Sequence, residues 1–302
     1  MNREPLSPKN DFVFKLLFGE QKRLNILRSF LQSVLDLPKE EYGRLVIVDP
    51  FLRREYRADK LGVLDVKIHT TSGKVLDVEI QVEPQDDMWE RILFYGARMT
   101  TEQLKSGHDY ELIKKVISII ILDWPMTGQE STAYHHCFRL IDERTGYRFP
   151  DLFEINTLEL PKLPTQPDGT DLYNWLRMFT AKTEEELTMV AKTSPEISQA
   201  VGIIMELSED EQVRLQAEAR EKYRRDEAAR RKLARREGLQ EGLQIGREEG
   251  REEGRQEGRQ EERLEVAKQL LLDKDSVERV VKVTGLTLEE VRALAAELPV
   301  IN

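Results

Sequence analysis

Two neighbouring segments of the chain carry acidic side chains at a spacing that could bind a metal ion. In both, polar and apolar residues alternate, which predicts two β-strands that each bury one face. Asp65 lies on the polar face of the first and Glu79 on that of the second, so antiparallel pairing would bring the two carboxylates together. Carboxylates suit Mg²⁺ or Mn²⁺, with waters and phosphate oxygens completing the shell. Such an ion would activate water for phosphodiester hydrolysis.

Two further polar residues accompany this pair. Lys67 shares a face with Asp65, and Gln81 shares one with Glu79. A cation or amide there could orient the attacking water and offset charge that develops on the phosphate. The competing interpretation is that all four residues are solvent-facing members of a hairpin whose other face packs on helices.

The loop between the strands determines their register. Both apolar sets fall on one face only if the loop has an odd length, for example three residues with Gly73 at a positive φ. That register places Asp65 opposite Glu79 or one step from it. The apolar sets are Leu64, Val66 and Ile68, and Leu76, Val78 and Ile80.

Helices and further strands are predicted around this hairpin. A helix should begin at Ser7, with Pro8 in its first turn, and end at Gly19, and a second should run to Leu37. A short strand is expected at 45–48, and a helix at 87–106 with Met88, Ile92, Tyr95 and Met99 on one face. The continuous apolar run 116–122 predicts a strand buried on both faces with a parallel neighbour. Strands are also expected at 134–141 and 153–160, followed by helices from Asp171.

Asp65, the Glu79-Ile80-Gln81 triplet and the order helix, three strands, helix, strand resemble the PD-(D/E)xK nuclease superfamily. Over roughly residues 5 to 160 the chain is similar to the recombination-promoting nuclease family, whose members are also described as transposases of the PD-(D/E)xK type. The segments that carry this likeness are Asp11-Phe12-Val13-Phe14-Lys15 with Phe18-Gly19, Leu64-Asp65-Val66-Lys67, Glu79-Ile80-Gln81, Arg91 through Tyr95 with Arg98, and Gly107 through Tyr110.

The resemblance implies an α/β restriction-endonuclease-like core, in which a central mixed sheet is flanked by helices and followed by a long helical tail. It implies an endonuclease of low specificity that cuts double-stranded DNA with Mg²⁺ or Mn²⁺, bound by Asp65 and Glu79. Gln81 stands where the superfamily pattern has lysine. The Gln81 amide could orient the water, or Lys67 could supply the missing charge from the neighbouring strand, and we expect both to act together. A catalytically weak or inactive domain is the alternative.

Three other residues are weaker candidates. Arg91 and Arg98 could contact DNA phosphates, although an exposed helix face explains them equally well. Asp11 could belong to the site, but an i,i+4 ion pair with Lys15 accounts for it without catalysis. The histidines show no zinc spacing, and the single cysteine, Cys137, is interpreted as a small buried hydrophobe.

Four parts are predicted along the chain: a nuclease-like domain at 1–165, a helical segment on or beside it at 170–207, a charged tail at 208–263, and a small helical hairpin at 264–302. Glycine recurs every four residues in the tail, which indicates a solvated helix or spacer, or else a surface for homo-oligomerisation. The hairpin has the outline of a helix-turn-helix, but a plain helical hairpin is the commoner structure. The glycines are Gly238, Gly242, Gly246, Gly250, Gly254 and Gly258.

Composition excludes some functions. A net charge of −10 argues against a protein that coats nucleic acid. No apolar run reaches the roughly 20 residues that cross a bilayer, and no phosphate-binding glycine loop follows a strand, so we expect a cytoplasmic protein without a nucleotide cofactor. The alternatives to an enzyme are a DNA-binding or regulatory protein on the same fold, and an assembly protein that acts through its tail.

Overall fold

The computed structural model describes residues 4–51, 64–128 and 130–297. The chain divides into two compact units, Met1–Asp226 and Glu227–Asn302. Residues 1–3 of the predicted first domain and 298–302 of the predicted hairpin lie outside the described residues.

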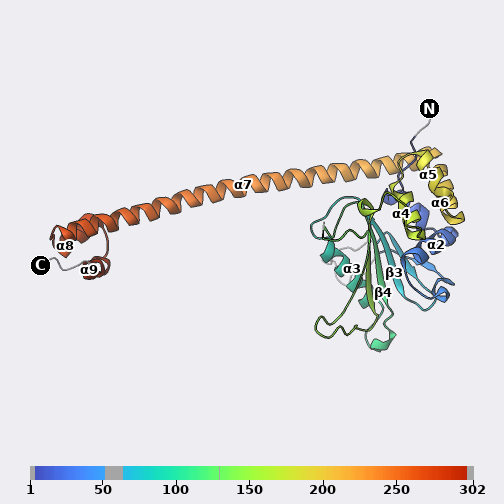
Figure 1. Cartoon of the computed structure of the whole chain (residues 1–302), viewed down its shortest axis with the longest axis horizontal. Coiled ribbons are helices and arrows are strands. Elements are labelled where there is room, and N and C mark those ends of the chain that lie inside the picture. The colour runs from blue at the N-terminus through green and yellow to red at the C-terminus, as the bar shows by residue number, and fades with distance from the viewer. Residues whose placement is uncertain (1–3, 52–63, 129, 298–302) are drawn as a thin grey trace. The chain divides into compact units, whose positions relative to one another are not determined.

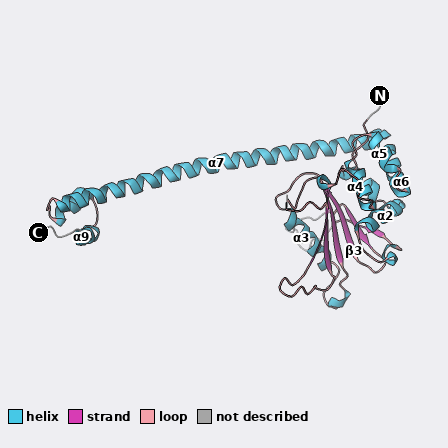
Figure 2. Ribbon diagram, viewed as in Figure 1, coloured by secondary structure: helices cyan, strands magenta, loops and turns pink. Residues whose placement is uncertain are grey.

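The first unit is built on one mixed sheet of six strands in the order β1-β2-β3-β4-β6-β5 (Figures 1 and 2). The strands are β1 (Val46–Val48), β2 (Val66–His69), β3 (Val75–Gln81), β4 (Val116–Leu122), β5 (His135–Arg139) and β6 (Phe153–Glu159). β4 runs parallel to β3 on one side and to β6 on the other, and the remaining pairs are antiparallel. The predicted mixed α/β sheet is therefore confirmed.

β4 lies inside the sheet, between β3 and β6. Every one of its residues is buried, as its continuous apolar sequence predicted. By contrast, β5 lies at the edge of the sheet, and its last three residues are exposed. Cys137 lies on this edge strand and is exposed, so the interpretation of Cys137 as a buried hydrophobe is wrong. An edge strand has a covering neighbour on one side only, which its sequence pattern does not reveal.

One face of the sheet is covered by α1 (Asp11–Phe18), α2 (Leu24–Val34), α4 (Asp171–Thr180), α5 (Glu184–Ala191) and α6 (Pro195–Glu209). Phe14, Phe18, Phe30, Trp175 and Phe179 form the aromatic centre of this layer. Four short 3₁₀ helices connect other elements: Gln21–Arg23, Lys39–Tyr42, Tyr110–Leu112 and Leu160–Lys162.

Three predicted helix ends are wrong. The helix predicted at 87–106 ends at Thr101, five residues early. α1 begins at Asp11, because the Asn10 side chain accepts hydrogen bonds from the N–H groups of Phe12 and Val13, while Ser7 begins a separate turn. α2 ends at Val34, three residues before Leu37, and Leu35 already has an extended backbone.

The opposite face of the sheet is covered by α3 (Met88–Thr101). Its buried residues include Met88, Ile92, Tyr95 and Met99, as predicted. Leu64 packs in the cluster with Tyr95 and Met99, although the alternation placed it with Val66 on the other face. The prediction fails because β2 begins only at Val66, so Leu64 precedes the regular pleat.

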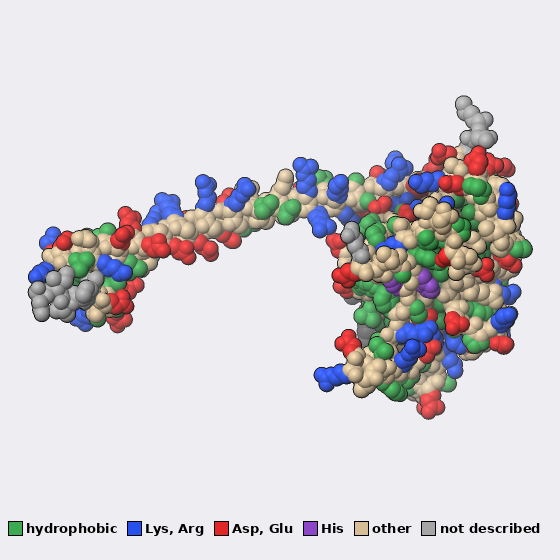
Figure 3. All heavy atoms as spheres, viewed as in Figure 1, with side chains coloured by type: hydrophobic (Ala, Val, Ile, Leu, Met, Phe, Trp, Pro, Cys, Tyr) green, Lys and Arg blue, Asp and Glu red, His purple; other side chains and the backbone are tan. Residues whose placement is uncertain are grey.

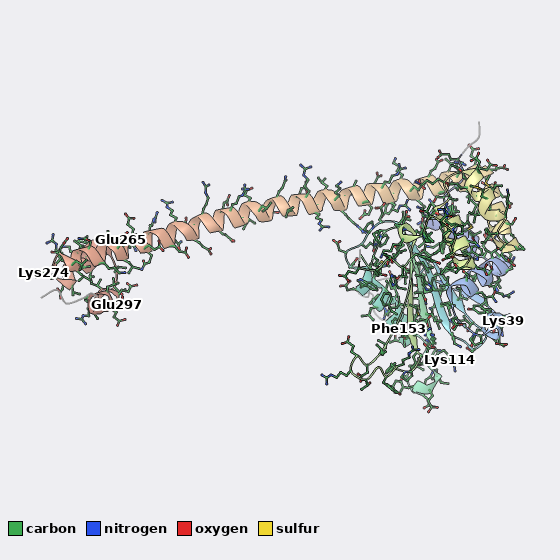
Figure 4. The ribbon with its side chains drawn as sticks, in the orientation of Figure 1. Lys39, Lys114, Phe153, Glu265, Lys274 and Glu297 are labelled. Atoms are coloured by element: carbon green, nitrogen blue, oxygen red, sulfur yellow. The ribbon has the colours of Figure 1, made fainter. Side chains whose placement is uncertain are left out.

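Gly96 allows α3 to lie close to β6. A Cβ at this position would lie 2.3 Å from Cε2 of Phe153, which Figure 4 labels. Gly96→Ala is therefore expected to lower the free energy of unfolding by about 1 to 3 kcal/mol through overpacking. The measurement is urea unfolding followed by circular dichroism.

Gly202→Ala is the matched control, because Gly202 is also helical and a Cβ there would meet nothing within 4 Å. It should stabilise the chain by roughly 0.5 to 1 kcal/mol, since alanine is the better helix former. Adding Phe153→Leu to Gly96→Ala should recover part of the loss. Equal stabilisation by both alanines would contradict the close packing of α3 on Phe153.

α7 (Glu211–Leu272) begins in the first unit and continues into the second, where α8 (Val277–Thr284) and α9 (Leu288–Glu297) follow. A Cβ on any of the six repeat glycines would meet nothing within 4 Å. Ala267, Val280, Leu286 and Val291 form a small core in the second unit, near Glu265 and Glu297 as labelled in Figure 4. Thr287 caps α9: its hydroxyl accepts a hydrogen bond from the N–H of Glu290 at 3.3 Å.

Candidate active site

The turn between β2 and β3 sets the register of the candidate site. Thr70 N–H donates to the carbonyl of Lys74 at 3.0 Å, which leaves three residues in the loop, and Gly73 has φ +86°. Val66 pairs with Val78 and Lys67 with Asp77, as the odd-length loop predicted. Asp65, one residue before β2, is therefore level with Glu79 at the carboxyl end of β3.

Asp65 is held by two different elements. Its Oδ2 accepts a hydrogen bond from the N–H of Ile80 at 3.1 Å, and its Oδ1 lies 3.0 Å from Nζ of Lys15 on α1. From the sequence, Lys15 was predicted only as an ion-pair partner of Asp11. Its one signal was its position in the N-terminal segment of the family resemblance, because no spacing rule links a residue of α1 to β2.

Glu79 is buried, with 2% of its surface exposed. Its Oε2 lies 3.6 Å from Nη2 of Arg91 and accepts a hydrogen bond from Nε2 of Gln81 at 3.3 Å. Its Oε1 is buried without a hydrogen-bond partner among the described residues. Burial raises the pKa of Glu79 to about 7, and the charge of Asp65 adds to this, although Arg91, Gln81 and Lys15 act in the opposite direction.

Asp77 lies one pleat deeper on the same face of β3 and was not predicted as a site residue. It is 2% exposed, and its Oδ1 also has no hydrogen-bond partner among the described residues. Burial raises its pKa well above the ordinary value, and the charges of Glu79 and Asp65 raise it further. The signal in the sequence was the polar alternation itself, which placed Asp77 in line with Glu79 but could not show that α3 covers it.

Lys67 and Gln81 both have partners. Nζ of Lys67 donates to Oε2 of Glu102, just beyond α3, at 3.0 Å. The Gln81 amide donates to Glu79 and accepts from Nε2 of Gln85 at 3.1 Å. The cation that contacts Asp65 is thus Lys15, while Lys67 lies opposite Asp77.

The three weaker candidates, Arg91, Arg98 and Asp11, have different surroundings. The Arg91 guanidinium stacks on Tyr95 at 5.1 Å and faces Glu79, so it belongs to the carboxylate site rather than to an exposed helix face. Arg98 lies over the ring of Phe94 at 5.8 Å. The predicted pair of Asp11 with Lys15 is wrong, because Lys15 reaches Asp65 and Asp11 lies 3.5 Å from Arg220 of α7.

The carboxylates fit a divalent cation in their chemistry. Two oxygens, Oε1 of Glu79 and Oδ1 of Asp77, are buried without partners among the described residues, and burial disfavours the ionised carboxyl groups. A bound cation would compensate for both. Within the described residues no group of three or more histidine, cysteine, aspartate or glutamate side chains is arranged to hold a metal. The site therefore offers a carboxylate pair, Asp65 and Glu79, that needs water or phosphate oxygens to complete a shell.

A mixed sheet flanked by helices, with the carboxylates of Asp65 and Glu79 on an internal hairpin, places the chain in the class of α/β proteins with a candidate acidic site on a central sheet. The family model described as PD-(D/E)XK nuclease family transposase matches residues 8–234, which is 227 of the 302 residues, and the chain belongs to this family. No curated protein and no solved structure matches the chain.

Membership in this family confirms the resemblance found in the sequence and gives the chain a nuclease or transposase-like role. The match extends beyond the predicted limit near residue 160 and includes α4, α5, α6 and the first turns of α7. Among the described residues, no helix combines the length and the apolar character needed to span a membrane.

Proposed function

We propose that the chain is a metal-dependent DNA endonuclease of low sequence specificity that acts on double-stranded DNA in recombination or transposition. The observation that supports this most directly is the pairing of Asp65 and Glu79 at the carboxyl end of β3, where Ile80 and Lys15 orient Asp65 and Arg91 faces Glu79. Low specificity is proposed because the cations of this site, Lys15 and Arg91, are suited to contacts with phosphate, and phosphate contacts carry no sequence information.

In this proposal, Mg²⁺ or Mn²⁺ held by Asp65 and Glu79 supplies an activated water and stabilises charge on the phosphate. Arg91 offsets part of the negative charge of the carboxylates. The Gln81 side chain, fixed between Glu79 and Gln85, presents an amide next to the metal-binding carboxylate, where it can orient a water molecule. Burial favours the neutral form of Asp77 in the metal-free site, and the charges of Glu79 and Asp65 act in the same direction.

Lys15 takes the place of the missing lysine in this scheme. We expect Lys15→Gln to lower the rate of metal-dependent nicking by about 10²-fold, the usual cost of losing one group that stabilises transition-state charge. Lys67→Gln is the matched variant, because Lys67 is bonded to Glu102, and it should cost less than about tenfold. Single-turnover nicking at saturating metal compares the two. A larger loss of nicking rate in Lys67→Gln than in Lys15→Gln would mean that Lys67 supplies the missing charge.

The experiment that tests the proposed function is nicking of supercoiled plasmid by wild type and by Asp65→Ala, each with Mg²⁺, Mn²⁺ or excess chelator. Metal-dependent nicking that disappears in Asp65→Ala supports the proposal. Salt-sensitive DNA binding without cleavage in either metal would favour a DNA-binding protein on the same fold, which the glutamine at position 81 makes a specific alternative.

We further propose that the glycine repeat of α7 supports homo-oligomerisation, because all six glycines face open space and would let a second helix approach closely. Replacing all six by alanine should strengthen the isolated helix, since each interior glycine costs roughly 1 kcal/mol relative to alanine. The same change should nevertheless reduce the molar mass measured by light scattering. An unchanged mass would show that the glycines are not an interface.

A further inference from the structure

One stretch of α7 carries a local excess of positive charge. Residues 220–236, called here the basic segment, contain nine Lys and Arg and three Asp and Glu, a net charge of +6 in a chain whose net charge is −10. Lys and Arg side chains are seen along α7 in Figure 3. The family match ends at residue 234 and so includes almost all of this segment.

The start of the basic segment lies beside the nuclease site. The turn of α7 that precedes it packs on α1 through a buried cluster of Leu6, Val13 and Ala217. Nδ2 of Asn10, the cap of α1, donates to the carbonyl of Ala217 at 2.9 Å. α1 also carries Lys15, which contacts Asp65, so one short helix joins the basic segment to the carboxylate site.

Two arginines of the segment face acidic residues but are held loosely. Nη1 of Arg220 lies 3.5 Å from Asp11, and Nε of Arg224 lies 4.0 Å from Glu83, which follows β3 by two residues. Both distances exceed the roughly 2.7–2.9 Å of charge-assisted hydrogen bonds. Nε of Arg224 is buried and has no hydrogen-bond partner among the described residues. Lys222 and Arg225, between and after them, are exposed.

The acidic residues that face the start of the basic segment would by themselves repel a polyanion. Asp11 of α1 faces Arg220, and Glu83, just beyond β3, faces Arg224. A protein that binds nucleic acid draws its affinity from Lys and Arg that displace counterions from phosphates. Within the first unit, residues 220–225 supply four such cations next to the acidic site.

We propose that residues 220–225, the start of the basic segment, bind the phosphodiester backbone of double-stranded DNA and hold it at the carboxylate site. The inference rests on the proposed function for the identity of the ligand, but it concerns binding and not cleavage. Backbone contacts carry no sequence information, so this helix would bind DNA of any sequence equally.

The test is binding of a fluorescent 20-base-pair duplex by the full chain in excess chelator, at several salt concentrations. The variant replaces Arg220, Lys222, Arg224 and Arg225 by glutamine. Its matched control replaces Arg247, Arg251, Arg255 and Arg259, which removes the same number of charges from the glycine repeat of the same helix. A second variant, Lys222→Gln with Arg225→Gln, leaves Arg220 and Arg224 in place and guards against a folding defect.

We expect the fourfold variant to weaken binding at least tenfold more than its control. The slope of log K against log salt should become shallower by roughly 0.9 for each phosphate that the variant no longer neutralises. The double variant should show about half of the change in slope. Equal binding by the fourfold variant and its control would overturn the proposal, and so would selective loss of binding to anionic phospholipid vesicles with DNA binding retained.

A plasmid-nicking assay distinguishes a failure of this inference from a failure of the proposed function. If wild type binds DNA through the basic segment but nicks no plasmid in Mg²⁺ or Mn²⁺, the inference stands and the endonuclease proposal fails. If nicking depends on Asp65 while the fourfold variant binds like its control, the endonuclease proposal stands and the inference fails.

Discussion

Asp65→Ala is expected to lower the rate of metal-dependent plasmid nicking by on the order of a thousandfold or more. Losing one group that stabilises the transition state typically costs 10² to 10³, and here the change would also remove a ligand of the proposed metal site. Asp65 is half of the carboxylate pair and the partner of Lys15, so its removal would leave Glu79 unable to hold the ion alone.

Asp65→Asn tests the role of the carboxylate charge separately from the role of the side chain in the hairpin. Asparagine can still accept the hydrogen bond from the N–H of Ile80, so the hairpin should keep its shape while the charge is removed. Glu90→Ala is the matched control, because Glu90 is an exposed acid in the first turn of α3. Full nicking by Asp65→Asn would mean that the carboxylate charge is not needed and that the site lies elsewhere.

Glu79→Gln is expected to raise the free energy of unfolding of the metal-free chain relative to wild type, and this advantage should be larger at pH 8 than at pH 4.5. The increase should reach up to about 3 kcal/mol. Burial raises the pKa of Glu79 from 4.5 to about 7, and that displacement corresponds to roughly 3 kcal/mol. Between these values the unfolded chain has released its proton while the folded chain retains it, so wild-type stability falls as pH rises from 4.5 to 7. The penalty is absent below this window and constant above it.

The measurement is urea unfolding of both proteins in chelator from pH 4.5 to 8. Weaker packing of the glutamine would shift the variant equally at every pH, so the informative quantity is the change in the difference between the two proteins. Mn²⁺ should then stabilise wild type at pH 8 by mass action and leave Glu79→Gln nearly unaffected. A difference between the proteins that does not vary with pH would contradict the raised pKa.

Much of the nuclease core was predictable from the sequence because its signals are local. Alternation in the segments of β2 and β3, together with Gly73 in the loop, predicted the register that places Asp65 level with Glu79. The unbroken apolar run of β4 predicted a strand buried between parallel neighbours. These patterns succeed because strand pairing and burial are read directly from a period of two residues.

The residues around the carboxylates were less predictable because they come from elements distant in sequence. Local spacing paired Asp11 with Lys15, but the packing of α1 directs Lys15 to Asp65 and leaves Asp11 facing Arg220. Helical periodicity placed Arg91 on α3 without showing that it faces Glu79.

The sequence by itself determined the strands, their register and the acidic pair, since these depend on neighbours along the chain. The tertiary structure decided how charged those groups are. α3 buries Glu79 and Asp77 and thereby raises their pKa values, and α1 and α7 add cations near the same end of the sheet. Burial and long-range electrostatics depend on which surfaces meet, and no local pattern encodes that.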